Sequence, residues 1–214
     1  NLIASAEEST VLAQYVREER APYRSYQSEA ALERALIRLL EEEGYAYLPI
    51  HDEAELIANL RTQLSALNDY AFTDAEWERF FKTSIAPEND GIAEKTRRIQ
   101  TDYIQNLKRD DGTTKNIRLI DKEYIHNNRL QVINQYAVEG GKDAGEHAAA
   151  HRNRYDVTIL VNGLPLVHLE LKRRGVEIRQ AFNQIRRYQR DSFWAGAGLY
   201  EYVQIFVISN GTNT

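Results

Sequence analysis

The sequence predicts an α/β domain in which helices flank a mixed central β-sheet. Apolar residues recur at every third or fourth position between about residues 28 and 98, which indicates amphipathic helices. After Lys95 the apolar period shortens toward two, which indicates strands. The Asn162-Gly163 pair between two apolar runs is typical of a tight hairpin turn. We therefore expect helical additions first, and a core sheet over about 100–211.

The first helix is expected over 28–43, with Ser28 as its N-cap and Gly44 at its end. Its apolar stripe consists of Leu32, Ala35, Leu36, Leu39 and Leu40. A short strand is expected over 45–50, followed by a helix over 53–68 with leucines at helical spacing.

A third helix is expected to begin at Thr73, which forms a capping box with Glu76, and to run through Phe81. Residues 87–91, which include a proline and a glycine, interrupt the helical pattern. The remaining elements follow from period and turn signals. They are strands over 101–107, 116–121 and 129–137, a mobile loop over 139–151, a hairpin of 154–161 with 164–172, a helix over 176–190 and a buried strand over 199–208.

Length and composition limit the class of protein. A chain of 214 residues is enough for one sizeable core, so we expect a single domain over 1–214. No apolar run is long enough to span a membrane, and the absence of cysteine excludes disulfides and fits a reducing cytoplasm. The net charge is −5, yet residues 151–190 carry nine Lys or Arg against three acids. A basic segment in an acidic chain predicts a phosphate-binding surface, although a solvated helix face gives the same pattern.

Three charged residues in the expected hairpin are candidates for a functional site. Asp156 begins one strand, and Glu170 and Lys172 end the next; residues two apart share a face of a strand. A plain two-residue turn would place Asp156 opposite Leu169 and turn it away from Glu170. The two carboxylates lie side by side only if a bulge or a longer loop shifts the register by one. We predict this irregularity.

Two carboxylates at the ends of apolar strands favour a bound Mg²⁺, with the Leu171 carbonyl as a third ligand. Such a centre suits phosphodiester hydrolysis, with Lys172 orienting the attacking water or stabilising developing charge. The alternative is structural: Asp156 caps a strand end, and Glu170 pairs with Lys172 or an arginine. In the following helix Gln184 and Tyr188 are four apart on one face, with Arg187 beside them, and this group suits contacts to DNA.

At these residues the sequence resembles the PD-(D/E)xK nuclease superfamily. More narrowly, it is similar to the N-terminal endonuclease domain of the R (motor) subunit of type I restriction enzymes. The resemblance is close from 152 to 211 and looser between 50 and 100. It rests on the segments 154–167, 170–175 and 181–188, the last with its Gln-x-x-x-Tyr element, and on parts of 26–33, 121–136 and 206–211.

This resemblance implies a restriction-endonuclease-like core, with Asp156 and Glu170 as metal ligands and Lys172 as the catalytic lysine. It implies Gln184 and Tyr188 as supporting residues near DNA, and a helix glutamate, Glu33 or Glu29, as an occasional auxiliary. It also implies double-stranded DNA as substrate and M (methyltransferase) and S (specificity) subunits as partners. ATP would act only through helicase-like motor domains, which this sequence lacks. We expect the chain to be an N-terminal fragment of such a subunit, located in the cytoplasm.

Two other functions remain open at this stage. A DNA-binding or docking module could keep the nuclease fold without cleaving DNA; replacing Glu170 would then change no activity. A stand-alone repair or junction-processing nuclease is disfavoured by the fragment-like end after 199–208.

Overall fold

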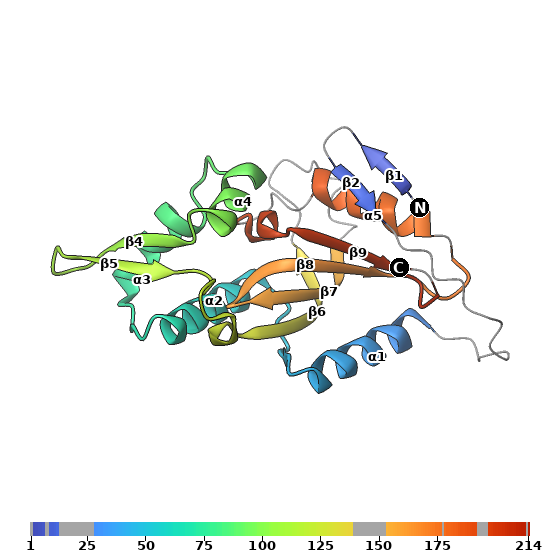
Figure 1. The fold of residues 1–214 in the computed structure, drawn as a ribbon, viewed down its shortest axis with the longest axis horizontal. Coiled ribbons are helices and arrows are strands. Elements are labelled where there is room, and N and C mark those ends of the chain that lie inside the picture. The colour runs from blue at the N-terminus through green and yellow to red at the C-terminus, as the bar shows by residue number, and fades with distance from the viewer. Residues whose placement is uncertain are drawn as a thin grey trace, which may run out of the picture.

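A computed structural model describes residues 2–6, 9–12, 28–138, 153–176, 178–191, 197–212 and 214. The expected loop over 139–151 lies outside the described residues. The centre of the molecule is a five-stranded mixed sheet with the strand order β3-β6-β7-β8-β9 (Figure 1). Its strands are β3 (Ala46–Tyr47), β6 (Leu130–Val138), β7 (Asn153–Val161), β8 (Leu164–Leu171) and β9 (Ile205–Ser209). The inner pairs are antiparallel, whereas β3 and β9 join as parallel edge strands. The predicted mixed sheet with flanking helices is confirmed.

Helices cover the sheet, and their boundaries follow from local signals. They are α1 (Glu29–Glu42), α2 (Glu53–Leu67), α3 (Asp74–Phe80) with a π-helical turn η1 (Phe81–Ile85), α4 (Ile92–Gln100) and α5 (Ile178–Asp191). Ser28 caps α1 by accepting from the Ala31 N–H at 3.2 Å. The capping box of Thr73 and Glu76 is present at the start of α3, as predicted. No helix in the described part of the chain is long and apolar enough to cross a membrane.

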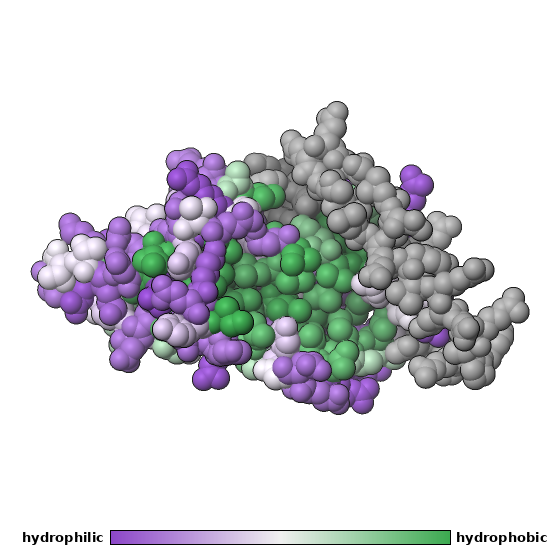
Figure 2. Space-filling model, viewed as in Figure 1, coloured by the Kyte–Doolittle hydropathy of each residue, from purple (hydrophilic) through white to green (hydrophobic). Residues whose placement is uncertain are grey.

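Two apolar clusters lie between these layers. The smaller one joins α1 to the sheet and contains Ile37, Val132, Val157, Leu169 and Leu171. The larger one joins the sheet to α2, α3, α4 and the 3-10 helix η4 (Leu199–Tyr202). Within the stripe expected for α1, Leu39 is 54% exposed, so that prediction was wrong at this position. Figure 2 shows apolar side chains gathered over the central strands of the viewed face, between α1 and α4.

Two further pairs of strands lie apart from the central sheet. β4 (Ile104–Lys108) and β5 (Thr114–Arg118) form an antiparallel hairpin, and β1 (Leu2–Ala6) pairs with β2 (Ser9–Leu12). The strands predicted over 101–107 and 116–121 correspond to the first hairpin with shifted ends. The β1–β2 pair was not predicted.

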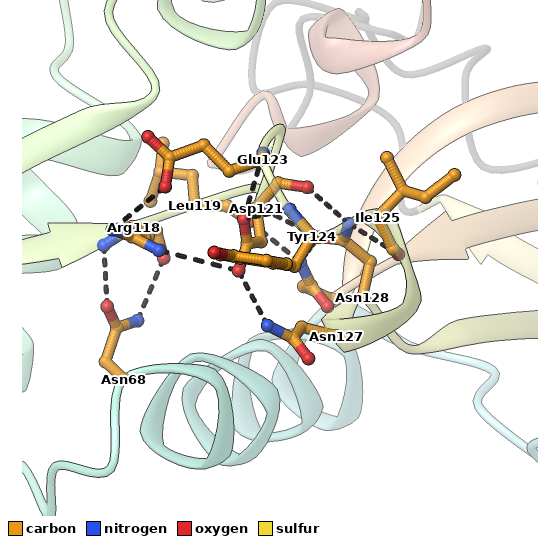
Figure 3. A network of polar contacts seen from close by, with 10 residues as sticks. Asn68, Arg118, Leu119, Asp121, Glu123, Tyr124, Ile125, Asn127 and Asn128 are labelled. Carbon is orange, nitrogen blue, oxygen red and sulfur yellow. Dashed lines mark hydrogen bonds and ion pairs between the residues drawn. The ribbon is translucent and has the colours of Figure 1, made fainter.

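The segment between β5 and β6 is fixed by one buried carboxylate (Figure 3). Asp121 accepts from the backbone N–H groups of Glu123 and Tyr124 and from the Asn127 side chain, at 2.8–3.1 Å. These donors, with the Tyr124 N–H the strongest, lower the pKa of Asp121. The Asn162 side chain, in the hairpin turn, donates to Asn128 Oδ1 at 2.8 Å and so extends this hydrogen-bond network. The start of β6 is thereby tied to the turn between β7 and β8.

Two predictions about the chain differ from the structure. The strand expected over 199–208 is divided: residues 199–202 form η4, and only β9 is extended. Gly198, with φ of +62°, redirects the chain immediately before η4. The strand expected to begin at 101 is preceded by α4, which extends through Gln100.

Candidate active site

The hairpin β7–β8 contains the irregularity that the sequence predicted. Next to the turn, Val161 pairs with Leu164 and Leu160 with Pro165. One residue is then skipped on β8, and Val157 pairs with Leu169. This bulge shifts the register by one, so that the next position along the pair sets Asp156 opposite Glu170.

The turn between β7 and β8 is held in place by hydrogen bonds and by contact with α2. Asn162 and Gly163 both have positive φ, +51° and +84°, as a two-residue hairpin of this twist requires. The Asn162 side chain donates to the Leu119 carbonyl at 3.0 Å and accepts from the Arg129 N–H at 2.8 Å. A Cβ on Gly163 would lie 2.6 Å from the Leu60 Cα, so α2 packs directly against the turn. The hairpin is therefore anchored at its closed end, away from the acidic residues.

Asp156 is partly buried and carries an unfavourable charge. Its Oδ2 accepts a hydrogen bond from the Leu171 N–H at 2.8 Å across the strand pair. Burial and, second, the negative charge of Glu170 raise the pKa of Asp156 to about 7, although the Leu171 N–H and Lys172 oppose this. The ionised carboxylate thus lacks enough positive charge around it among the protein groups, and a cation would supply it.

Glu170 and Lys172 lie together on β8, as their spacing predicted. The Lys172 ammonium donates to Glu170 Oε1 at 2.8 Å and to the Leu171 carbonyl at 3.1 Å. Glu170 is fully buried, and its Oε2 accepts no hydrogen bond within the described part of the chain. His168 Nε2 is 3.6 Å from that oxygen. A buried carboxylate oxygen without a donor is costly, and a divalent cation would satisfy it.

The donor set at this place fits a hard cation. The two carboxylates and the Leu171 backbone lie together near the start of β7 and the end of β8, and oxygen ligands of this kind suit Mg²⁺ with several retained waters. Among the described residues, no cluster of three or more Asp, Glu, His or Cys side chains is arranged to hold a metal ion.

Of the two glutamates considered as auxiliaries, Glu33 and not Glu29 lies toward the pair. Glu33 accepts from the Asn134 side chain and from the Gln135 side chain, each at 2.6 Å, and its charge contributes to the raised pKa of Asp156. Glu29 instead accepts from the Arg173 N–H at 3.1 Å.

The predicted DNA-contacting group lies on α5, which contacts β8 and β9. Gln184 is partly buried there. Arg187 and Tyr188 belong to the same helix, but their side chains lie outside the described residues. Their supporting role stays a prediction.

Sequence reasoning missed two features beside the site. His168 is fully buried, packs edge-on against Tyr155 at 5.2 Å and lies next to Glu170. Its position two residues before Glu170, on the same strand face, was the available signal. The second feature is Gln135, whose left-handed backbone conformation no pattern in the sequence announces.

Comparison with known proteins identifies the family. A sequence model described as "Type I restriction enzyme R protein N terminus" matches residues 26–214. The type I restriction enzyme EcoprrI endonuclease subunit of Escherichia coli is 51% identical over 191 residues, which are 89% of this chain and 58% of that protein. The SauMSSORF170P endonuclease subunit of Staphylococcus aureus (strain MSSA476) is 40% identical over 195 residues, 89% of this chain and 19% of that protein. The HindI endonuclease subunit of Haemophilus influenzae is 33% identical over 116 residues, 53% of this chain and 10% of that protein.

The chain thus spans little more than half the length of the first of these relatives and about a fifth of the second. The family match, in contrast, extends over most of the chain and includes every residue of the candidate site. The chain therefore belongs to the family of type I restriction enzyme R protein N-terminal regions.

Proposed function

We propose that this chain is the DNA-cleaving domain of a type I restriction enzyme R subunit and hydrolyses phosphodiester bonds with Mg²⁺. The observation that carries this proposal is the bulge in β7–β8, which sets Asp156 opposite Glu170 while Lys172 contacts Glu170 at 2.8 Å. The mixed sheet with flanking helices is consistent with a restriction-endonuclease-like core formed by one domain over 1–214. Family membership and the printed names of the relatives support the same activity.

In this proposal each residue has a distinct task. Asp156 and Glu170 would hold Mg²⁺ through carboxylate oxygens, with the Leu171 carbonyl as a third protein ligand. The bound cation would supply Lewis-acid polarisation of the phosphodiester. Lys172 donates to Glu170 Oε1 and to the Leu171 carbonyl, and its ammonium would orient a water and stabilise negative charge on a phosphate. Gln184, Arg187 and Tyr188 on α5 would contact the DNA backbone.

The proposal extends to the whole assembly. Double-stranded DNA is the substrate, M and S subunits are the partners, and ATP acts through motor domains outside this chain. Cleavage is coupled to DNA translocation by those domains. A cytoplasmic location belongs to the same proposal, and the absence of cysteine supports it.

The test compares Lys172→Ala with wild type in the full-length R subunit assembled with its M and S subunits. We expect DNA cutting to fall by at least about a hundredfold, as for loss of one charge-stabilising group, while ATP hydrolysis is retained. Lys82→Ala is the matched control, because Lys82 forms an exposed pair with Glu78 on the surface of α3 and η1. Equal cutting by wild type and Lys172→Ala would refute the proposal. If Glu170→Ala also leaves every activity unchanged, the domain is a docking module without chemistry.

A further inference from the structure

The carboxylate of Glu33 on α1 is held by two neighbouring residues of one strand. Asn134 Nδ2 donates to Glu33 Oε1 and Gln135 Nε2 donates to Glu33 Oε2, both at 2.6 Å. In a regular strand, adjacent side chains point to opposite faces of the sheet. Two consecutive residues of β6 therefore reach the same carboxylate only where the strand departs from regular geometry.

Gln135 is the residue at which the strand departs. Its φ is +52°, in the left-handed region that non-glycine residues seldom occupy. Pairing between β6 and β7 is regular up to Asn134 with Val157 and resumes at Tyr136 with Tyr155. The one residue pair missing from this ladder is the pair between them, at which Gln135 lies opposite Asp156.

Because of this irregularity at Gln135, the side chains of Asn134 and Tyr136 lie on opposite faces of the sheet, although the residues are two apart. Asn134 faces α1, where it meets Glu33. Tyr136 enters the larger apolar cluster instead, where its ring lies 6.2 Å from Tyr155 and 4.9 Å from Tyr200. Strain of this kind persists only where the surroundings enforce it, and it often marks a functional site.

Glu33 is brought near the site by this pairing. Gln135 holds the Glu33 carboxylate at 2.6 Å and occupies the position of β6 that faces Asp156 on β7, so the negative charge of Glu33 lies close to Asp156. Because the described residues contain no three-acid cluster close enough to hold an ion, Glu33 is not a direct third ligand in this geometry. With both oxygens held by amides, the Glu33 carboxylate stays fixed next to the β6 position that faces Asp156. A fixed negative charge there increases the attraction for a divalent cation.

We propose that Gln135 is a positioning residue: its left-handed backbone and its side-chain amide fix Glu33 near Asp156 and thereby strengthen cation binding at the Asp156–Glu170 pair. This inference rests on the proposed function, because it takes the Asp156–Glu170 pair as the cation site. Residues that orient the immediate ligands of a metal typically change its affinity by about 10- to 100-fold when replaced. Since Glu33 acts without direct ligation, we expect the lower end of that range.

The test measures Mn²⁺ binding by electron paramagnetic resonance in the full-length R subunit, without DNA or ATP. We expect Gln135→Ala to bind Mn²⁺ roughly tenfold more weakly. Gln135→Asn should recover most of the affinity, because asparagine tolerates the left-handed region and keeps an amide donor. Gln131→Ala is the matched control, because Gln131 lies on the same strand but exchanges hydrogen bonds with Asn59 on α2. Its affinity should equal that of wild type.

A double-mutant cycle separates positioning from general damage. In a Glu33→Gln background, Gln135→Ala should cause no further loss, because Gln135 acts through the charge of Glu33. An equal loss with and without Glu33→Gln, or wild-type binding by Gln135→Ala, overturns the inference. If Gln135→Ala does not fold, Gln135→Gly keeps the backbone conformation, removes the amide and is subject to the same criteria. Wild-type Mn²⁺ binding by Glu170→Ala would instead contradict the proposed function, whereas loss in Glu170→Ala with none in Gln135→Ala contradicts only the positioning role.

Discussion

Asp156 provides a direct link between the chemistry of the site and the stability of the fold. Burial and the neighbouring Glu170 raise its pKa from 3.8 to about 7, so the folded protein holds its ionised form at a cost. At about 1.4 kcal/mol for each tenfold change in proton affinity, the full cost is about 4 kcal/mol. Asp156→Asn removes the charge and keeps an oxygen that can accept from the Leu171 N–H. We therefore expect this variant to be more stable than wild type at neutral and higher pH.

The sign of the pH dependence follows from the two states. Between about pH 4 and pH 7 the unfolded chain has released the Asp156 proton, whereas the folded chain retains it. The free energy of unfolding therefore falls as pH rises through this window and levels off above it. Between about pH 5 and pH 8, wild type should lose roughly 2.5 kcal/mol relative to Asp156→Asn.

The measurement is urea unfolding of both proteins at the two pH values, in the presence of a chelator to keep divalent cations away. Taking the difference between the proteins removes the contribution of other titrating groups that behave alike in both. The reasoning is refuted if the stability difference between wild type and Asp156→Asn is the same at both pH values. It is equally refuted if wild type gains stability relative to the variant as pH rises.

Two further variants test how the fold supports the site. Gly163→Ala should cost at least about 3 kcal/mol in urea unfolding, because its Cβ would lie 2.6 Å from the backbone of Leu60. Gly112→Ala shares φ of +84° but meets nothing within 4 Å, so a cost as large as that of Gly163→Ala would contradict the clash. Lys95→Met leaves Glu201 buried without its partner and should lower the free energy of unfolding by about 3–5 kcal/mol. The double variant Lys95→Met/Glu201→Leu should recover this stability. An unchanged loss of stability in the double variant would argue against this account.

Local sequence signals predicted most helix ends and the geometry of the hairpin. Ser28 and the Thr73–Glu76 capping box work within three residues, so no tertiary information was needed to find them. The bulge was predicted for a different reason: only a shift of register lets Asp156 and Glu170 lie together. The requirement that the two carboxylates lie together thus predicted a backbone irregularity that the strand propensities of the residues do not indicate.

The failures have physical causes that lie outside any short window. α4 was missed because it has few apolar residues. Its buried positions are Lys95 and Ile99, and the buried Lys95 ammonium is paired with Glu201 on η4 and donates to the Gly198 carbonyl. Eight of the ten residues over 199–208 are apolar or aromatic, which suits a strand, but the chain turns after the left-handed Gly198. Gln135, with its left-handed backbone, donates to Glu33, about a hundred residues earlier in the chain. Tertiary contacts decide each of these cases.

The bulge in β7–β8 means that the number of residues between the turn and Glu170 matters more than the identity of several of them. Deleting one residue near Leu166 would restore regular pairing and rotate Glu170 to the face opposite Asp156, with the acids themselves untouched. Substitutions at the bulge should therefore be accepted far more readily in relatives than insertions or deletions within 163–169. If the proposed function holds, a change of a single codon in length would abolish DNA cleavage as completely as replacement of Asp156 or Glu170.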